Sequence, residues 1–176
     1  MEESAGGILF VTSKNVGSGE MLFAKKSFVE ARFNEIEPRS ILQRNDILTN
    51  LVGASIARTA LFDLDCVANI NQAVGVIRIA EGCINKPLLV AYMNSAAGVA
   101  YMLEHQFAPG RANLSLADMA RMLVPLPPLD EQAAIVDRVE ALMTNCRALE
   151  AEIEHSRTHA AHLLQAVLKE AFAPAS

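Results

Sequence analysis

Hydrophobic and polar residues follow two different patterns along this chain. Up to about residue 126, short apolar runs are separated by segments rich in Gly, Asn, Asp and Ser, a pattern typical of strands and turns. These runs predict strands at 8–11, 21–23, 47–51, 59–62, 73–79 and 123–126. Apolar residues on nearly all sides of the stretch 88–103 predict a mostly buried helix that begins at Pro87. Ser115, with Asp118 three residues later, is typical of the start of a further short helix. Strands first and helices later indicate an α+β fold.

The C-terminal part of the chain is different, because no Gly or Pro occurs from Glu131 to Phe172. Its apolar residues recur at heptad spacing for about five repeats, with Ser156 as the polar member of the series. The positions that we predict to contact a partner helix are Ile135, Val139, Leu142, Cys146, Leu149, Ile153, Ala160, Leu163 and Val167. A helix of roughly 60 Å cannot bury such a stripe against a domain of ordinary size. We therefore expect a coiled coil between two chains, and a simple dimerising stalk is an equally complete account of this helix.

A proline pair separates the two patterns. The residues from Pro125 read P-L-P-P-L-D-E-Q, and neither Pro127 nor Pro128 can lie inside a helix. Asp130 and Glu131 then place negative charge where a helix N-terminus stabilises it. We expect a compact mixed domain over residues 1–129 and a long dimerisation helix over residues 130–173.

The charge balance gives no sign of a nucleic-acid binder. The chain of 176 residues is 52% hydrophobic and has a net charge of −5. Residues 1–129 carry 11 Lys and Arg against 12 Asp and Glu, and residues 130–176 carry 4 against 8. On composition alone we would argue against DNA, since such proteins usually present a basic surface. No apolar run approaches the ~20 residues that cross a bilayer, so we expect a soluble, cytoplasmic protein with no membrane partner.

The residue types that support catalysis or metal binding lack the required motifs. His155, His159 and His162 share a helix face and could hold a metal with a nearby glutamate, although a solvated helix surface is the better interpretation. Cys66 and Cys83 belong to no C-x-x-C pair, and we expect both to be buried as small hydrophobes. The sequence contains no H-E-x-x-H, no G-x-S-x-G and no glycine-rich phosphate loop. We therefore expect no catalytic residue and no metal ligand in this chain.

Several segments resemble one known family. The junction P-L-P-P-L-D-E-Q-A-A-I-V-D-R-V-E-A-L is similar to the boundary between target recognition domain and conserved helix in specificity (S) subunits of type I restriction-modification systems. The stretch from Gly53 to Thr59 resembles the family's G-x-I-G-[KR]-T loop, with Ala57 in place of the second glycine. Asn71-Gln72 and the run 112–115 resemble two further segments. Full members have two recognition domains and two such helices, so this chain resembles a half-subunit.

The resemblance implies a non-catalytic, sequence-specific subunit that binds double-stranded DNA. It also implies a homodimer that reads a palindromic bipartite site, with methyltransferase (M) and restriction (R) subunits as partners. S-adenosylmethionine, ATP and Mg²⁺ would then be bound by those partners and not by this chain. The near-neutral charge is compatible with this expectation if another subunit supplies much of the phosphate attraction.

Candidate DNA-reading residues are donors and acceptors on predicted loops. An Asn-Gln pair suits adenine, an exposed Arg suits guanine, and Gly53 lets the backbone approach a phosphate closely. The candidates are Lys14, Asn15, Ser55, Arg58, Asn71, Gln72, Arg111 and Asn113. Each could instead serve as a turn or capping residue. The alternative for the whole chain is a dimeric coiled-coil adaptor whose globular head binds protein.

Overall fold

Two three-stranded sheets organise the N-terminal unit, which extends to Ala133 in the computed structural model. The structure describes residues 7–105 and 113–172. The first sheet has the order β2-β1-β5 and contains β1 (Ile8–Val11), β2 (Phe28–Val29) and β5 (Ala68–Ile70), with β1 antiparallel to β2 and parallel to β5. The second sheet has the order β4-β3-β6, is antiparallel throughout, and contains β3 (Asp46–Asn50), β4 (Thr59–Phe62) and β6 (Val74–Ile77).

Strand β3 is buried on both faces. Successive side chains of a strand point to opposite faces, and here Leu48 joins a core cluster with residues of both sheets, such as Leu9 and Phe62. Ile47 joins a second cluster with residues of the helices, such as Met93 and Met102. This double coverage explains why the adjacent residues Ile47 and Leu48 are both fully buried although they point to opposite faces of β3.

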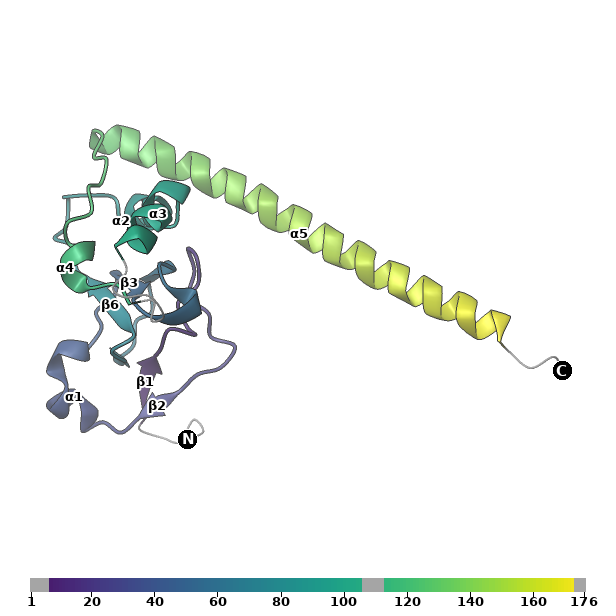
Figure 1. Cartoon of the computed structure of the whole chain (residues 1–176), viewed down its shortest axis with the longest axis horizontal. Helices are drawn as coiled ribbons and strands as arrows, with labels where there is room; N and C mark the ends of the chain where they lie inside the picture. The colour runs from purple at the N-terminus through teal and green to yellow at the C-terminus, as the bar shows by residue number, and fades with distance from the viewer. Residues whose placement is uncertain (1–6, 106–112, 173–176) are drawn as a thin grey trace. The chain divides into compact units, whose positions relative to one another are not determined.

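Four shorter helices occur in the described part of the N-terminal unit, residues 7–105 and 113–133. They are α1 (Phe33–Ile36), α2 (Lys86–Met93), α3 (Ala96–Glu104) and α4 (Leu116–Met119), and the 3-10 turns are η1 (Pro38–Ser40) and η2 (Gly53–Ser55). Figure 1 shows α2 and α3 on one side of β3 and β6, with β1 and β2 on the other. Ser115 caps α4 as predicted, because its hydroxyl accepts a hydrogen bond from the Asp118 amide at 3.0 Å. The same hydroxyl also contacts the Asp118 carboxylate.

The predicted helix over 88–103 is wrong in one respect, because it is two helices. Asn94 ends α2, and its side chain accepts from the Thr59 amide at 3.2 Å and donates to the Thr59 carbonyl at 2.7 Å. Ser95 then caps α3 by accepting from the Gly98 amide. A Cβ atom on Gly98 would lie only 2.4 Å from the Tyr92 carbonyl oxygen, so α3 approaches the end of α2 too closely for any other residue. Contacts between distant segments therefore break a helix that the apolar pattern alone would continue.

Two predicted strands are also wrong. Residues 21–23 contribute only the isolated bridge Val16–Met21, and residues 123–126 form no strand at all. The second of these segments lies next to the prolines, which cannot complete a ladder. β2 and β5 are too short for their pattern to be seen in the sequence. Cys66 and Cys83 lie in loops and are exposed, which corrects the expectation that they are buried.

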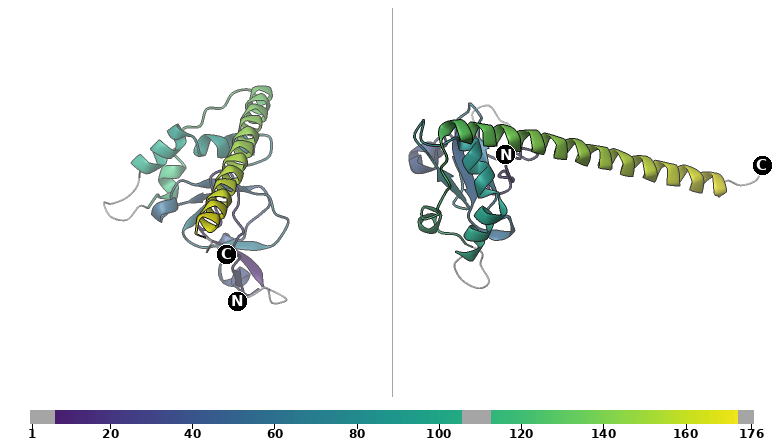
Figure 2. Two further views of the ribbon diagram at one scale, coloured as in Figure 1. Left: turned by 90° about the vertical axis from the view of Figure 1, so that its right-hand side faces the viewer. Right: turned by 90° about the horizontal axis from the view of Figure 1, so that it is seen from above.

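As far as the structure describes it, the C-terminal unit, from Ala134 onward, consists of the continuation of helix α5 (Leu129–Ala171). α5 is a single unbroken helix in all three views of Figures 1 and 2. The heptad positions Leu142, Leu149, Ile153, Leu163 and Val167 are 48% to 60% exposed in the single chain. Ile135 and Val139 are half-buried, while Cys146 and Ala160 are exposed. Among the described helices, none is long and apolar enough to span a membrane.

Candidate nucleic-acid interface

The long loop between β1 and β2 is organised by Asn15. This side chain is only 4% exposed. Its oxygen accepts from the amide and hydroxyl of Thr12 at 3.0 and 3.1 Å, and its nitrogen donates to the carbonyls of Leu22 and Lys25, both at 3.0 Å. The polar atoms of Asn15, a predicted DNA contact, are therefore hydrogen-bonded within the protein and buried. This corrects the sequence-based assignment. Its role is to shape the loop that presents the exposed Lys14.

The same loop is fastened to one end of the β4-β3-β6 sheet. Asn50, the last residue of β3, donates from its side chain to the carbonyls of Ser13 at 2.9 Å and Val16 at 3.3 Å. The Gly19 amide donates to the Thr59 carbonyl at 2.9 Å. The Asn50 side-chain oxygen is buried and has no hydrogen-bond partner among the described residues. These bonds bring a loop from the first sheet to the end of a strand in the second.

The turn that joins β3 to β4 contains two residues in the left-handed region. Gly53 has a φ of 78° and Ala57 has a φ of 71°. Ala57 is 1% exposed and donates its amide to the Asn50 carbonyl at 3.0 Å. An L side chain in this conformation costs roughly 1–2 kcal/mol, so Ala57 is a strained position in the turn. The turn leaves Ser55 half-buried and Arg58 exposed.

Two further segments reach the same end of β3. The Leu51 amide donates to the Ala73 carbonyl at 2.8 Å, which holds the turn containing Asn71 and Gln72. Val52 forms a bridge with Asn113, which is exposed. Gln72 is exposed, but the Asn71 side chain accepts from the Ala73 amide at 3.2 Å and so shapes its own turn. Arg111 lies outside the described residues.

The segments that converge at this end of β3 carry every described DNA-reading candidate. The exposed polar side chains among these candidates are Lys14, Arg58, Gln72 and Asn113. We call this set, together with Lys25 and Lys26, the loop surface. The two additional lysines are exposed, and the Asn15 bond to the Lys25 carbonyl places their segment beside the turn of Lys14. The adjacent basic pair at 25–26 was the sequence signal that could have identified them.

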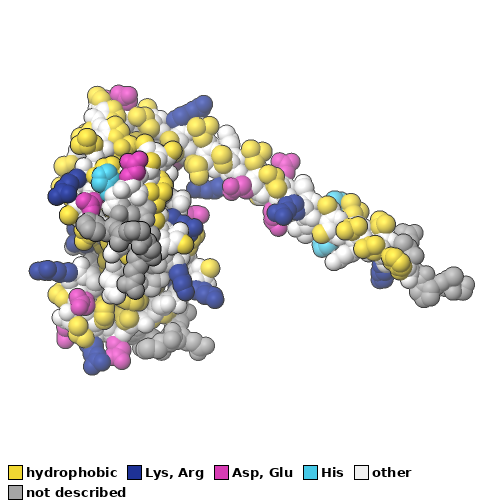
Figure 3. Space-filling model, viewed as in Figure 1, with side chains coloured by type: hydrophobic (Ala, Val, Ile, Leu, Met, Phe, Trp, Pro, Cys, Tyr) yellow, Lys and Arg dark blue, Asp and Glu magenta, His cyan; other side chains and the backbone are white. Residues whose placement is uncertain are grey.

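The cations of the loop surface are available for a ligand. In the part of the chain that the structure describes, Lys14, Lys25, Lys26 and Arg58 take part in no ion pair, although Glu20 lies on the same loop. In the view of Figure 3, Lys and Arg side chains occur as separate groups and not as one continuous patch. A small number of free cations beside amide side chains fits a surface that contacts a few phosphates and base edges.

Other charged groups serve the scaffold. Arg78 makes two hydrogen bonds to the Asp46 carboxylate, at 2.7 and 2.6 Å, and the Asp46 side chain is only 2% exposed. The hydrogen bond with Asp46 raises the pKa of Arg78 above its ordinary value. Lys86 lowers the pKa of Glu81 through a hydrogen bond on the surface. No group of three or more His, Cys, Asp or Glu that could hold a metal ion occurs within residues 7–105 and 113–172.

The first turn of α5 is fastened to the N-terminal unit by one side chain. Gln132 is 1% exposed; its oxygen accepts from the Asn85 amide and its nitrogen donates to the Pro127 carbonyl, each at 2.8 Å. Asn85 is the N-cap of α2. The glutamine of the P-L-P-P-L-D-E-Q junction thus joins the starts of two helices and the proline segment.

The described residues form an α+β domain that is followed by a long helix. The model for the type I restriction modification DNA specificity domain matches residues 38–156. The chain is 31% identical over 134 residues to the type I restriction enzyme EcoBI specificity subunit of Escherichia coli, a match that covers 76% of this chain and 28% of that protein. The chain belongs to this family of type I restriction-modification specificity subunits. It spans little more than a quarter of the length of that curated relative.

Solved structures share the fold. One, described as the structural basis of complex assembly and conformational transition of the type I R-M system, superposes with a TM-score of 0.74 and 20% identity, over 97% of this chain and 44% of that one. The crystal structure of the HsdS subunit from Thermoanaerobacter tengcongensis superposes with a TM-score of 0.63 and 20% identity, over 97% and 45%. These likenesses confirm the α+β architecture with its long helix. The chain corresponds to less than half of each of these two structures.

Proposed function

We propose that this chain is a non-catalytic DNA-recognition component of a type I restriction-modification enzyme. Membership of the specificity-subunit family supports DNA as the ligand. The structural observation on which the proposal rests is the convergence of four segments at one end of β3. Arg58 and Gln72 would read base edges in the major groove, while Lys14, Lys25 and Lys26 would contact phosphates.

The experiment that tests the loop surface is selection from a randomised duplex library, with and without M subunits, followed by gel shift of the enriched sequence. Arg58→Ala should relax the preference at one base position, at a cost of about 1–3 kcal/mol if the guanidinium reads a base. Arg44→Ala is the matched control, because Arg44 is an exposed arginine that precedes β3, whereas the loop surface lies at the end of β3. Equal losses for both variants, or no selected sequence even when M subunits are present, would contradict the proposal. A head that binds a protein and no DNA would instead favour the adaptor alternative.

The proposal includes two copies of the chain and the docking of M subunits, through which R subunits join. S-adenosylmethionine, ATP and Mg²⁺ belong to those partners in this scheme. The near-neutral N-terminal unit can release few counterions, so the isolated chain should bind DNA weakly with a shallow salt dependence. Addition of M subunits should steepen the dependence, which titrations at several salt concentrations will measure. Tight, steeply salt-dependent DNA binding by the chain alone would refute the proposal that the M subunits supply most of the phosphate contacts.

Two identical readers impose a two-fold symmetric site. The recognised sequence should be a palindrome of two short half-sites around an unread spacer, with the half-sites about one turn (~10 bp) or a multiple apart. Insertion of two base pairs in the spacer should abolish binding, because the helices fix the separation. An asymmetric bipartite site in the methylome of cells whose sole specificity component is this chain would disprove the symmetric assembly.

A further inference from the structure

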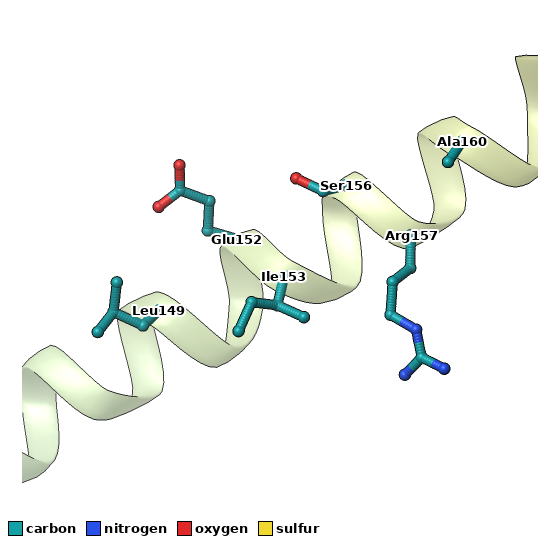
Figure 4. A pocket seen from close by; sticks show the side chains of 6 residues that line it. All are labelled: Leu149, Glu152, Ile153, Ser156, Arg157 and Ala160. Carbon is teal, nitrogen blue, oxygen red and sulfur yellow. The ribbon is translucent and has the colours of Figure 1, made fainter.

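The exposed arginine of the loop surface, Arg58, lies on a turn and not on a helix. Figure 4 shows the contrast on α5, where Arg157 lines an open groove and extends from a helix whose own hydrogen bonds fix the backbone. Arg58 lies between η2 and β4 and directly precedes the first residue of β4. The contacts of the two peptide groups that adjoin its Cα atom therefore determine where its guanidinium can reach.

Contacts within the turn fix the peptide before Arg58. The Ala57 carbonyl accepts a hydrogen bond from the Thr59 hydroxyl at 3.1 Å. The Arg58 amide donates to the Ser55 carbonyl at 3.3 Å. These partners are within three residues of Arg58, so the turn holds this peptide without help from distant segments.

Two distant segments fix the peptide after Arg58. The Arg58 carbonyl accepts from the Asn50 amide at 2.9 Å, and the Thr59 amide donates to the side-chain oxygen of Asn94 at 3.2 Å. The Asn94 nitrogen donates to the Thr59 carbonyl at 2.7 Å and to the Val90 carbonyl of α2 at 2.8 Å. The Asn94 amide thus pairs with the outer edge of β4, the terminal strand of its sheet, as a neighbouring strand would. Both peptides that adjoin Arg58 are fully hydrogen-bonded, and only its side chain is free to turn.

The Thr59 carbonyl also joins the loop of Lys14 to this arrangement. It accepts from the Asn94 side chain at 2.7 Å and from the Gly19 amide at 2.9 Å. Gly19 lies on the loop between β1 and β2, which presents Lys14. The proposed phosphate contact and the proposed base contact are therefore held by one peptide group, to which Asn94 is bonded from the end of α2.

We propose that Asn94 is a positioning residue for DNA reading, because it fixes the backbone from which Arg58 extends toward one base pair. This inference rests on the proposed function and adds a residue that lies outside the loop surface. A side chain that reads a base edge must be held within about 0.5 Å of its productive position. An arginine on a loose backbone would contact phosphates as readily as bases, and phosphate contacts contain no sequence information.

Selection from a randomised duplex library, with M subunits present, tests this role. Asn94→Ala should weaken the preference at the base position that Arg58→Ala relaxes, and leave the other positions unchanged. We expect a loss of about fivefold, which is part of the discrimination that one side-chain contact to a base edge provides. Addition of Asn94→Ala to Arg58→Ala should reduce the preference no further, since the two residues act through one contact.

Ser95→Ala is the matched control at the same break between α2 and α3. The Ser95 hydroxyl donates to the Tyr92 carbonyl at 2.6 Å and accepts from the Gly98 amide at 3.2 Å, so its bonds stay within the helices. Its loss removes the N-cap of α3 and should lower stability while the base preference is retained. An equal loss of preference in both variants, or an unchanged preference in Asn94→Ala, would overturn the positioning role.

Amide hydrogen exchange, measured by NMR on the chain without DNA, tests the physical basis separately. The Thr59 amide should exchange about two- to tenfold faster in Asn94→Ala, the range that one hydrogen bond contributes, and less so in Ser95→Ala. Unchanged exchange would show that Asn94 does not fix this backbone. Faster exchange with an unchanged base preference would refute the role in reading. A complex that selects no sequence would refute the proposed function, and the exchange rates would still decide whether Asn94 holds the turn.

Discussion

Replacement of Gln132 should weaken the attachment of the first turn of α5 to the N-terminal unit. The side chain is 1% exposed, and its two 2.8 Å hydrogen bonds satisfy the Asn85 amide and the Pro127 carbonyl. Gln132→Met keeps the length and removes both polar atoms. Each lost hydrogen bond is worth about 0.5–1.5 kcal/mol, and each buried partner left unsatisfied adds to the cost. Asn85 and Pro127 are themselves half-buried, so water can reach them in part. We expect a loss of about 2–3 kcal/mol in the free energy of unfolding.

Gln132→Glu provides a test with a defined sign. One carboxylate oxygen can still accept from the Asn85 amide, but the other meets the Pro127 carbonyl, and burial disfavours the charge. The folded-state pKa of the introduced carboxyl should therefore be raised above its unfolded value of ~4.3. Between those two pKa values the carboxyl is more protonated in the folded protein than in the unfolded chain. The free energy of unfolding of the variant therefore falls as pH rises through that window. The deficit relative to the unmodified chain should be large at pH 7 and shrink as pH falls toward ~4.3.

Tyrosine fluorescence during urea denaturation measures this unit selectively. The chain has no Trp and two Tyr, and both tyrosines, Tyr92 and Tyr101, lie in α2 and α3. All variants should be compared at one protein concentration, because dimerisation contributes to apparent stability. Glu131→Ala is the control, since Glu131 is its exposed neighbour on the same turn. A Gln132→Met variant that is no less stable than this control would refute the reasoning.

Three further perturbations have defined outcomes. Gly53→Ala should lower the free energy of unfolding by about 1–2 kcal/mol, because a left-handed φ penalises any side chain even in open space. Ala57→Gly should change it by no more than about 1 kcal/mol, since the relief of backbone strain offsets the greater entropy of the unfolded chain. A larger loss for Ala57→Gly than for Gly53→Ala in urea denaturation would contradict this account of the turn. Arg78→Met should lower the free energy of unfolding by about 2–3 kcal/mol in the same assay. The loss is smaller than for a fully buried ion pair, because the Arg78 side chain is 47% exposed. An unchanged free energy of unfolding would mean that the buried Asp46 carboxylate needs no partner. Leu142→Glu/Leu149→Glu should be monomeric by light scattering, because charges enter the predicted seam; a variant that remains dimeric, or an unmodified chain that is a monomer at micromolar concentration, would exclude the seam as the interface.

Features controlled by local sequence were predictable. The strand at 59–62 matches β4, the strand at 8–11 matches β1, and Ser115 caps α4 as expected. The long helix predicted over residues 130–173 differs from α5 (Leu129–Ala171) by at most two residues at either end. Each of these elements depends on residues within a few positions of one another, such as a cap or a periodic apolar stripe. The family resemblance was likewise carried by contiguous segments, above all the proline junction.

Only the tertiary structure decided which polar side chains face solvent and which hold the fold together. Asn15 and Gln72 are both loop amides in the sequence, yet the first is buried by carbonyls seven and ten residues away and the second is exposed. The sequence around Gln132, an acidic first helical turn, does not predict that this side chain is buried. Its hydrogen-bond partners, the Asn85 amide and the Pro127 carbonyl, come together only in the folded chain. The break at Asn94 depends in the same way on Thr59. The role of each of these side chains depends on the groups that it contacts in the folded protein. Because those groups are distant in sequence, the local sequence pattern does not predict the contacts.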